Sequence, residues 1–253
     1  MLIMNDQMRP GIYPHQDLYK DAEVYSVMFS WDPAIEIKYI TNIVKKFSPM
    51  NIRNSVFLDI GCGTGRIARR LSEHARGVVC LDKSFEMLIY GDAEVMRVNA
   101  DMLTIPIRDN SINVAYNLLA TINHLSSLDD LAQHISEVHR ILKNDGLYIV
   151  DLVLEEPPCI GMCDEWNTRY RDMECMARHI VESVQDNQFI EVLELMCENK
   201  VIVRSRDALL LPRTRSFIDK ALDSGFKQVI FLKPFTLKTM NKPQGRVFAV
   251  LIK

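Results

Sequence analysis

A glycine-rich segment follows the first strongly apolar run of the chain, and its residue types suit nucleotide binding. The apolar run, residues 56–60, leads into Gly61, Gly63 and Gly65, after which apolar side chains recur at helical spacing over residues 67–71. Glycines let the backbone turn sharply and approach a ligand closely. The N–H groups that open the following helix then face a polar or anionic group. The segment predicts a strand, a turn and a helix arranged around a nucleotide-like ligand.

Charge at this turn distinguishes two classes of nucleotide cofactor. A dinucleotide fingerprint needs G-x-G-x-x-G, but here the last glycine position is Arg66. Asp59, just before the turn, would repel a pyrophosphate, whereas it would attract the sulfonium and ammonium groups of S-adenosylmethionine. The turn therefore predicts S-adenosylmethionine, with S-adenosylhomocysteine as its product, rather than a nicotinamide cofactor.

Further acids stand at the ends of the next two apolar runs. Asp82 ends the run 78–82 and is predicted to bind both ribose hydroxyls; a solvated loop acid is the alternative. Asp101 follows the third run and is predicted to accept from the adenine amine. Met87 and Met102 are the expected soft walls for the ring, although Met87 taken alone would suit the core.

Apolar runs alternate with amphipathic segments through residues 55–153. The runs cover 56–60, 78–81, 95–98, 112–118 and 147–153, and the helix candidates cover 65–75, 85–91 and 128–142. Such alternation predicts a parallel sheet covered on both faces. Residues 155–211 differ, because 173–184, 189–197 and 201–211 read as strands joined by polar turns, an antiparallel meander. A helix at 214–224 and strands at 229–232 and 247–252 then resume the alternation.

Together these motifs resemble class I S-adenosylmethionine-dependent methyltransferases. Residues 59–66 match the family's glycine motif, Asp82 its ribose acid, 83–88 its D-x-S-x-x-M-L run, and 139–146 the turn before its fifth strand. The resemblance implies an α/β, Rossmann-like, doubly wound sheet of seven strands with the last strand antiparallel. It also implies cofactor contacts from Cys62, Lys83 and Asn117, the last residue of the fourth strand.

The same resemblance implies three parts of the chain. Residues 1–54 are expected to form an N-terminal helical lid. Residues 55–154 and 212–253 are expected to form the cofactor-binding domain, and 155–211 an antiparallel β cap inserted after the fifth strand.

On the acceptor side, residues 18–26 and 119–125 resemble the lid and the loop of amino-sugar and glycine-type N-methyltransferases. This implies a small-molecule acceptor, with methylation of nitrogen ahead of oxygen. Tyr25 is expected to cover the methionine part of the cofactor, and Tyr19 and Trp166 to line the acceptor site; packing is the alternative for all three. His124 is the expected base, since histidine takes up a proton near neutral pH, and a structural histidine is the alternative.

Bulk properties narrow the function further. The net charge of −3 does not suggest that the protein surface as a whole attracts nucleic acid. Residues 151–199 hold 12 acidic and 3 basic side chains (−9), whereas 200–253 hold 3 and 12 (+9). Cross-strand pairing explains this switch, and a basic face for an anionic substrate is the alternative. Methylation of RNA or protein, or a non-catalytic S-adenosylmethionine-binding module, therefore stays open.

Location and assembly are less constrained. No apolar stretch suits a membrane span, and residues 1–11 lack the pattern of a signal peptide. The six cysteines form no C-x-x-C pair, so free thiols in a reducing cytoplasm are expected, with no metal site. The sequence does not predict an oligomeric state.

Overall fold

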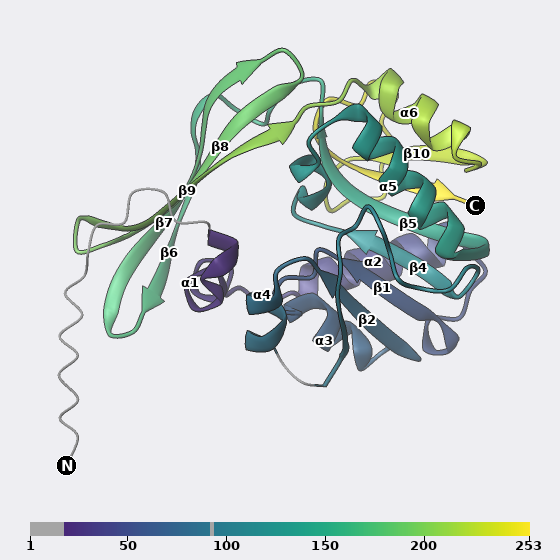
Figure 1. Ribbon diagram of the computed structural model, residues 1–253, viewed down its shortest axis with the longest axis horizontal. Coiled ribbons are helices and arrows are strands. Elements are labelled where there is room, and N and C mark those ends of the chain that lie inside the picture. The colour runs from purple at the N-terminus through teal and green to yellow at the C-terminus, as the bar shows by residue number, and fades with distance from the viewer. Residues whose placement is uncertain (1–17, 92–93) are drawn as a thin grey trace.

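A computed structural model describes residues 18–91 and 94–253, and two β-sheets organise it (Figure 1). The larger sheet has seven strands in the order β10-β11-β5-β4-β1-β2-β3. These strands are β1 (Val56–Ile60), β2 (Gly77–Asp82), β3 (Met96–Asn99), β4 (Ile112–Asn117), β5 (Leu142–Leu154), β10 (Gln228–Leu232) and β11 (Gly245–Ile252). Strand β11 runs antiparallel to β5 and β10, and the remaining neighbours pair in parallel. The predicted Rossmann-like sheet with an antiparallel last strand is confirmed.

Helices cover both faces of this sheet (Figure 1). One face packs against α5 (Leu128–Ile141) and α6 (Thr214–Asp223), and the other against α2 (Ala34–Phe47), α3 (Arg66–Ser72) and α4 (Phe85–Tyr90). Strand β1 shows why, since Leu58 and Ile60 point to the α5 side and Phe57 to the α2 side. A strand buried on both faces reads as a continuous apolar run, which is the pattern of residues 56–60.

The smaller sheet is antiparallel, in the order β6-β7-β8-β9. Its strands are β6 (Gly161–Tyr170), β7 (Met173–Gln185), β8 (Gln188–Cys197) and β9 (Lys200–Leu210). The sequence predicted a meander of three strands, and the structure adds β6 at the edge. Because β6 pairs on one side only and its side chains are exposed or half-buried, it lacks the apolar alternation that marks its neighbours.

The N-terminal segment packs against this smaller sheet. It contains the short helix η1 (Leu18–Lys20) and α1 (Ala22–Met28). Val24 and Met28 lie in one apolar cluster with Leu195 and Val203 of the sheet. Helix α2 instead covers the large sheet, and a one-turn helix η2 (Ile52–Asn54) leads into β1. The first 17 residues of the expected lid lie outside the described residues, and its boundary at residue 54 stays a prediction.

The expectation of free thiols is wrong for four of the six cysteines. Cys159 bonds to Cys163, and Cys175 on β7 bonds to Cys197 on β8, where the two residues stand opposite each other. Register between paired strands, which the sequence spacing does not reveal, brings the second pair together. Cys62 and Cys80 are free. The cysteines therefore no longer support a reducing compartment. Within the described ranges, no helix has the length and apolar character needed to cross a bilayer.

Candidate active site

The glycine loop between β1 and α3 has a backbone that needs glycine. Gly61, Gly63 and Gly65 have φ angles of +71°, +56° and +77°, a region that glycine enters without steric cost. A Cβ atom at Gly61 would lie 2.3 Å from Cγ2 of Thr121, and one at Gly63 would lie 3.3 Å from Cε1 of Tyr25. Both side chains therefore occupy the space that a larger residue would need.

Asp82, at the end of β2, connects this loop to the next one. Its Oδ2 accepts a hydrogen bond from the N–H of Gly63, and its Oδ1 accepts one from the N–H of Ser84, both at 2.8 Å. Burial raises the pKa of Asp82, and these two N–H groups oppose that rise. Each carboxylate oxygen keeps a second lone pair. Asp82 is thus able to accept from ribose hydroxyls while it holds the loop.

Asp59 lies beneath the loop, and its environment differs from the one predicted. It is only 4% exposed. It is not among the residues that line the cavity beside the glycine loop, which Gly61, Gly63 and Asp82 do line. Burial raises the pKa of Asp59 to about 7, and the charge of Asp82 adds to this rise. Asp59 is therefore only partly ionised near neutral pH, and it discriminates against a pyrophosphate less strongly than the sequence predicts.

The residues expected around adenine follow β3. Oδ1 of Asp101 accepts from the N–H of Leu103 at 2.8 Å, and Asp101 and Met102 both line the cavity. Met87, in contrast, is a fully buried residue of α4 and does not line the cavity. The alternative of core packing therefore fits Met87 better than the role of an adenine wall.

His134 of α5 fixes the backbone at Met102. Its Nδ1 lies 3.0 Å from the carbonyl oxygen of Met102, and its Nε2 lies 2.8 Å from the hydroxyl of Tyr148. Burial lowers the pKa of His134 to about 4. The ring is therefore neutral, with Nδ1–H donating to the carbonyl and Nε2 accepting from the hydroxyl.

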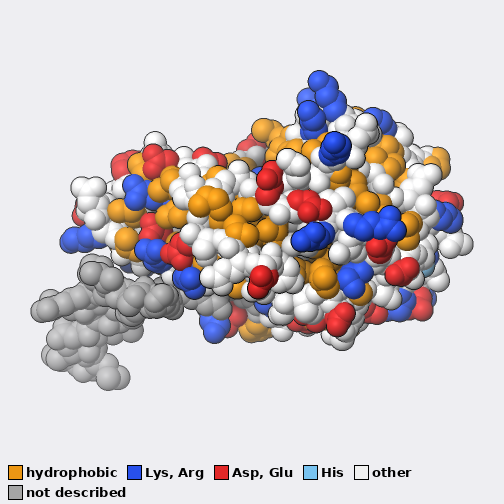
Figure 2. Space-filling view, turned by 90° about the horizontal axis from the view of Figure 1, so that it is seen from above, with side chains coloured by type: hydrophobic (Ala, Val, Ile, Leu, Met, Phe, Trp, Pro, Cys, Tyr) orange, Lys and Arg blue, Asp and Glu red, His pale blue; other side chains and the backbone are white. Residues whose placement is uncertain are grey.

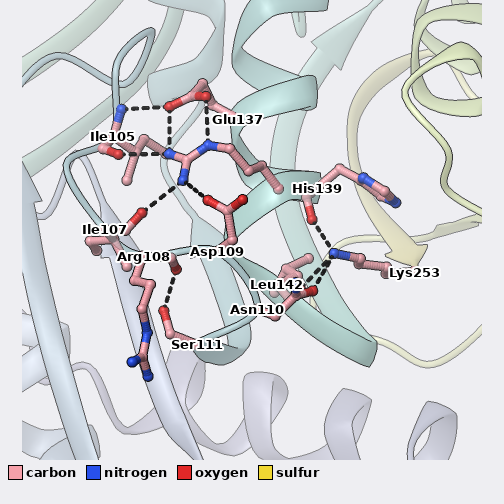
Figure 3. A network of polar contacts seen from close by, with 11 residues as sticks. Ile105, Ile107, Arg108, Asp109, Asn110, Ser111, Glu137, His139, Leu142 and Lys253 are labelled. Atoms are coloured by element: carbon pink, nitrogen blue, oxygen red, sulfur yellow. Dashed lines mark hydrogen bonds and ion pairs between the residues drawn. The ribbon is translucent and has the colours of Figure 1, made fainter.

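Arg140 holds the rest of the loop between β3 and β4; its partners Ile105, Ile107, Asp109 and Glu137 are labelled in Figure 3. Its guanidinium donates to the carbonyl oxygens of Ile105 and Ile107 at 2.8 Å each and pairs with Asp109. It also pairs with Glu137, which accepts from the N–H of Ile105 at 2.9 Å. These bonds fix a segment without regular secondary structure beside the expected adenine site.

The turn after β4 carries two residues in a strained conformation. Leu119 and Ala120 have φ angles of +54° and +55°, a region that non-glycine residues enter at a cost. Asn117 stabilises this turn because its Nδ2 donates to the carbonyl of Ile60 at 3.0 Å and its Oδ1 accepts from the N–H of Ile122 at 2.9 Å. The fully buried Asn117 side chain is thus engaged by the protein, and its predicted contact with the cofactor stays untested.

A second buried amide fixes the one-turn helix η3 (Thr121–His124). Nδ2 of Asn123 donates to the carbonyls of Val153 at 2.9 Å and Leu210 at 2.7 Å, and its Oδ1 accepts from the N–H of Val153 at 3.0 Å. The end of η3 is therefore attached to both β5 and β9. His124, the next residue, takes its position from this attachment.

His124 contacts Tyr19 of the N-terminal segment. Nε2 of His124 lies 3.1 Å from the hydroxyl of Tyr19, and the two rings meet edge to face at 5.2 Å. The carbonyl of Tyr19 accepts from the hydroxyl of Ser84 at 2.7 Å. Tyr19 thus joins the loop after β2, where the ribose is expected, to the histidine after β4.

Aromatic side chains of the N-terminal segment form the roof. The ring of Tyr25, packed on Gly63, lies 4.7 Å from the ring of Phe29, and burial raises the pKa of Tyr25. Nε1 of Trp166 donates to the carbonyl of Met28 at 2.7 Å, and its ring lies 6.1 Å from Phe29. Trp166 therefore does both things that the sequence offered as alternatives, since it packs on α1 and also lines the cavity.

One cavity of about 1330 Å³ brings most of the expected site residues together. Small-molecule sites usually measure about 300–1,000 Å³, so this cavity has room for a cofactor and a second small molecule. Of the predicted residues, it is lined by Tyr19, Tyr25, Gly61, Gly63, Asp82, Lys83, Asp101, Met102, His124 and Trp166. Asp59, Cys62, Met87 and Asn117 do not line it.

The inner face of the small sheet forms the far wall and carries a row of ionisable groups. Asp164 stands opposite His179, and Glu191 stands opposite Asp207, on four consecutive strands. Nε2 of His179 lies 2.8 Å from Oε1 of Glu191. All four line the cavity, and β6 to β9 contribute no lysine or arginine to it. Glu191 and Asp207 are like charges placed directly opposite each other, which is unfavourable. A bound cation beside them would reduce this repulsion.

On the outer face of the same sheet, acidic and basic strands pair. Arg204 lies 3.0 Å from Glu194 and 2.9 Å from Glu182, and Arg206 lies 2.7 Å from Glu182. These contacts support cross-strand pairing as the explanation for the charge switch. Figure 2 shows positive and negative side chains interspersed over one face of the molecule. The basic stretch therefore gives no specific support to RNA as the substrate.

Several cavity residues escaped the sequence prediction. Glu36, Arg246 and the row of the small sheet come from segments far apart in the chain, and none belongs to a recognisable motif. Thr121 and Asn123 lie inside the segment 119–125 that the resemblance singled out, but nothing in their types signalled the packing on Gly61 or the buried amide contacts.

Comparison with known proteins identifies the fold. Residues 58–150 match the family described as "Methyltransferase domain". The chain is 30% identical over 143 residues to an uncharacterized protein of Methanocaldococcus jannaschii, covering 54% of this chain and 53% of that protein. The chain thus spans about half the length of this relative.

Two solved structures cover nearly the whole chain. An S-adenosylmethionine-dependent methyltransferase from Clostridium acetobutylicum has a TM-score of 0.71 at 15% identity, over 94% of this chain and 99% of that one. A sugar N-methyltransferase from a Streptoalloteichus species has a TM-score of 0.71 at 16% identity, over 100% of this chain and 98% of that one.

The fold is therefore that of S-adenosylmethionine-dependent methyltransferases, as the sequence predicts. Within it, residues 58–150 are the part that matches the methyltransferase domain family.

Proposed function

We propose that the protein transfers a methyl group from S-adenosylmethionine to an amine nitrogen of a small molecule. The observation that carries this proposal is the single cavity in which the glycine loop and Asp82 face the inner wall of the small sheet, with Tyr19 and His124 in contact between them. The similarity in fold to a sugar N-methyltransferase supports the same acceptor class.

The donor set fits this cofactor. The glycine loop allows close approach, Asp82 keeps lone pairs for ribose hydroxyls, and Asp101 keeps Oδ2 for the adenine amine. When bound, S-adenosylmethionine supplies a methyl group activated by its sulfonium, which leaves as a neutral thioether. The protein's task is then to align the acceptor and to exclude water. The packed aromatic rings of Tyr25, Phe29 and Trp166 provide that exclusion.

His124 is the proposed base. An amine attacks only through its free lone pair, so its ammonium form must first lose a proton. Nε2 of His124 already contacts the hydroxyl of Tyr19, and the hydroxyl orients the ring toward the cavity. Asn123, through its three hydrogen bonds to Val153 and Leu210, holds the neighbouring histidine in place against β5 and β9.

The row Asp164, His179, Glu191 and Asp207 is the proposed acceptor wall. Carboxylates accept from ammonium and hydroxyl groups, and they repel phosphates. Acceptors that carry amine and hydroxyl groups without a phosphate fit this wall. A hydroxyl-only acceptor would leave the negative row without a cation.

The test is an acceptor screen with S-adenosylmethionine, in which S-adenosylhomocysteine and the mass of the product are measured. Amino sugars and small amino alcohols are expected to be methylated, and their deamino analogues are not. Asp207→Asn should raise KM for the amine, whereas Asp186→Asn in the β7–β8 turn should not. Methylation of the deamino analogues at equal rates would refute the assignment to nitrogen, and turnover with RNA alone would refute the small-molecule class.

A further inference from the structure

Glu36 presents a buried oxygen atom that no residue in the described ranges satisfies. This residue, in the first turn of α2, is 6% exposed and lines the cavity. Its Oε1 accepts from Nε1 of Trp31 at 2.8 Å, but its buried Oε2 has no hydrogen-bond partner among residues 18–91 and 94–253. Buried polar atoms are rarely left unpaired because desolvation is then uncompensated. A ligand donor at Oε2 would remove this cost.

The nearby cations of the protein are already engaged. Arg66 lies 3.7 Å from Oε1, and its guanidinium stacks on Trp31 and donates to the Trp31 carbonyl at 2.9 Å. Arg246 makes two hydrogen bonds to Asp151, at 3.0 and 2.7 Å. Neither guanidinium reaches Oε2. The missing partner is therefore a donor that enters through the cavity.

The position of Glu36 identifies which part of a ligand meets it. Asp101, Asp82 and the glycine loop follow β3, β2 and β1, which are consecutive strands. A ligand with adenine at Asp101 and ribose at Asp82 extends its remaining part over the glycine loop. Arg66 is the first residue after that loop, so Glu36 stands at the end of this line. In S-adenosylmethionine, the remaining part is an amino acid with an α-ammonium group.

We infer that Oε2 of Glu36 accepts a hydrogen bond from the α-ammonium group of the cofactor. Glu36 is thereby a cofactor-recognition residue, and Trp31 and Arg66 are positioning residues that present its carboxylate. The inference rests on the proposed function, because it presupposes that this cavity binds S-adenosylmethionine.

Calorimetry with two ligands tests the inference without any turnover. The first ligand is S-adenosylhomocysteine, and the second is its desamino analogue, in which hydrogen replaces the α-amino group. Neither carries a sulfonium, so they differ only at the group in question. Glu36→Gln should weaken S-adenosylhomocysteine roughly 10- to 100-fold, as expected for a hydrogen bond between charged groups. The same substitution should change the Kd of the analogue by less than about 2-fold.

Two matched variants complete the design. Glu73→Gln removes an exposed carboxylate that pairs with Arg70 and should leave both affinities unchanged. Trp31→Phe removes the donor to Oε1 and should weaken S-adenosylhomocysteine less than Glu36→Gln does.

Each outcome has a distinct meaning. Equal weakening of both ligands by Glu36→Gln would overturn the inference, because it would show a purely structural carboxylate. If Glu36→Gln left the affinity for S-adenosylhomocysteine unchanged but weakened the binding of the amine acceptor, the inference would also be overturned, and Glu36 would be an acceptor-binding residue. If the wild-type protein binds neither ligand, the proposed function itself fails.

Discussion

Substitution of Gly61 by alanine tests the packing of the glycine loop against the turn after β4. The new Cβ would lie 2.3 Å from Cγ2 of Thr121 at a φ of +71°. The left-handed backbone costs an alanine about 1–2 kcal/mol. Relief of the clash requires rotation of Thr121, which breaks its hydrogen bond to the carbonyl of Leu118 at 2.8 Å, or a shift of the loop. Overpacking of this kind costs about 1–3 kcal/mol.

Gly61→Ala is therefore expected to lower the free energy of unfolding by about 2–5 kcal/mol, measured by urea denaturation. Thr121→Ser removes Cγ2 but keeps the hydroxyl, so it should restore about 1–3 kcal/mol in the Gly61→Ala background. Gly77→Ala is the matched control, since no atom lies within 4 Å of the added Cβ. If Gly61→Ala costs no more than Gly77→Ala, or if Thr121→Ser gives no rescue, the packing argument is refuted.

Three further predictions concern charge, catalysis and covalent structure. The pKa of Asp59 is raised above its ordinary 3.8 to about 7, so between these pH values the native state binds a proton that the unfolded state has lost. The free energy of unfolding should therefore fall as pH rises from 3.8 to 7. Asp59→Asn should flatten this fall, and an unchanged pH profile in the variant would contradict the prediction. Calorimetry should also show that the affinity for S-adenosylmethionine rises through pH 7 in the wild type, as Asp59 loses its proton. The affinity of Asp59→Asn should not rise in this way. His124→Ala should lower kcat/KM for the amine about 100- to 10,000-fold and leave the Kd for S-adenosylhomocysteine unchanged. Tyr19→Phe should lower kcat/KM less. If His124→Ala also weakened the binding of S-adenosylhomocysteine, the histidine would be structural. Replacing Cys175 and Cys197 by serine should cost about 2–4 kcal/mol by urea denaturation, and equal stability of the wild type with and without reductant would argue against the bond.

The central strands of the large sheet were predictable because they are buried on both faces. Residues 56–60 and 147–153 read as apolar runs for that reason. Strand β6 was not predictable, since an edge strand with polar residues such as Asp164 and Arg169 has no such run. Strand pairing likewise decides which cysteines meet, so the disulfide between Cys175 and Cys197 depends on a register that the sequence does not state.

The cofactor side of the site was more predictable than the acceptor side. Asp82 and the glycines belong to one local motif at consecutive strand ends, and the cavity contains them. Burial changed the expected role of Asp59, because the sequence shows the carboxyl group but not its desolvation. Glu36 and the row on the inner face of the small sheet depend on how distant segments pack. Their types alone suit a solvent-exposed surface equally well.

The most direct test of the account is calorimetric titration of the wild-type protein and Asp82→Ala with S-adenosylhomocysteine. The account predicts one site per chain in the wild type, with a Kd of about 1 μM to 1 mM, the range in which enzyme KM values fall. It predicts at least a roughly 10-fold loss in Asp82→Ala, because the hydrogen bonds proposed between Asp82 and the ribose hydroxyls would disappear. No heat of binding in the wild type, or equal affinity in the variant, would contradict the central claim.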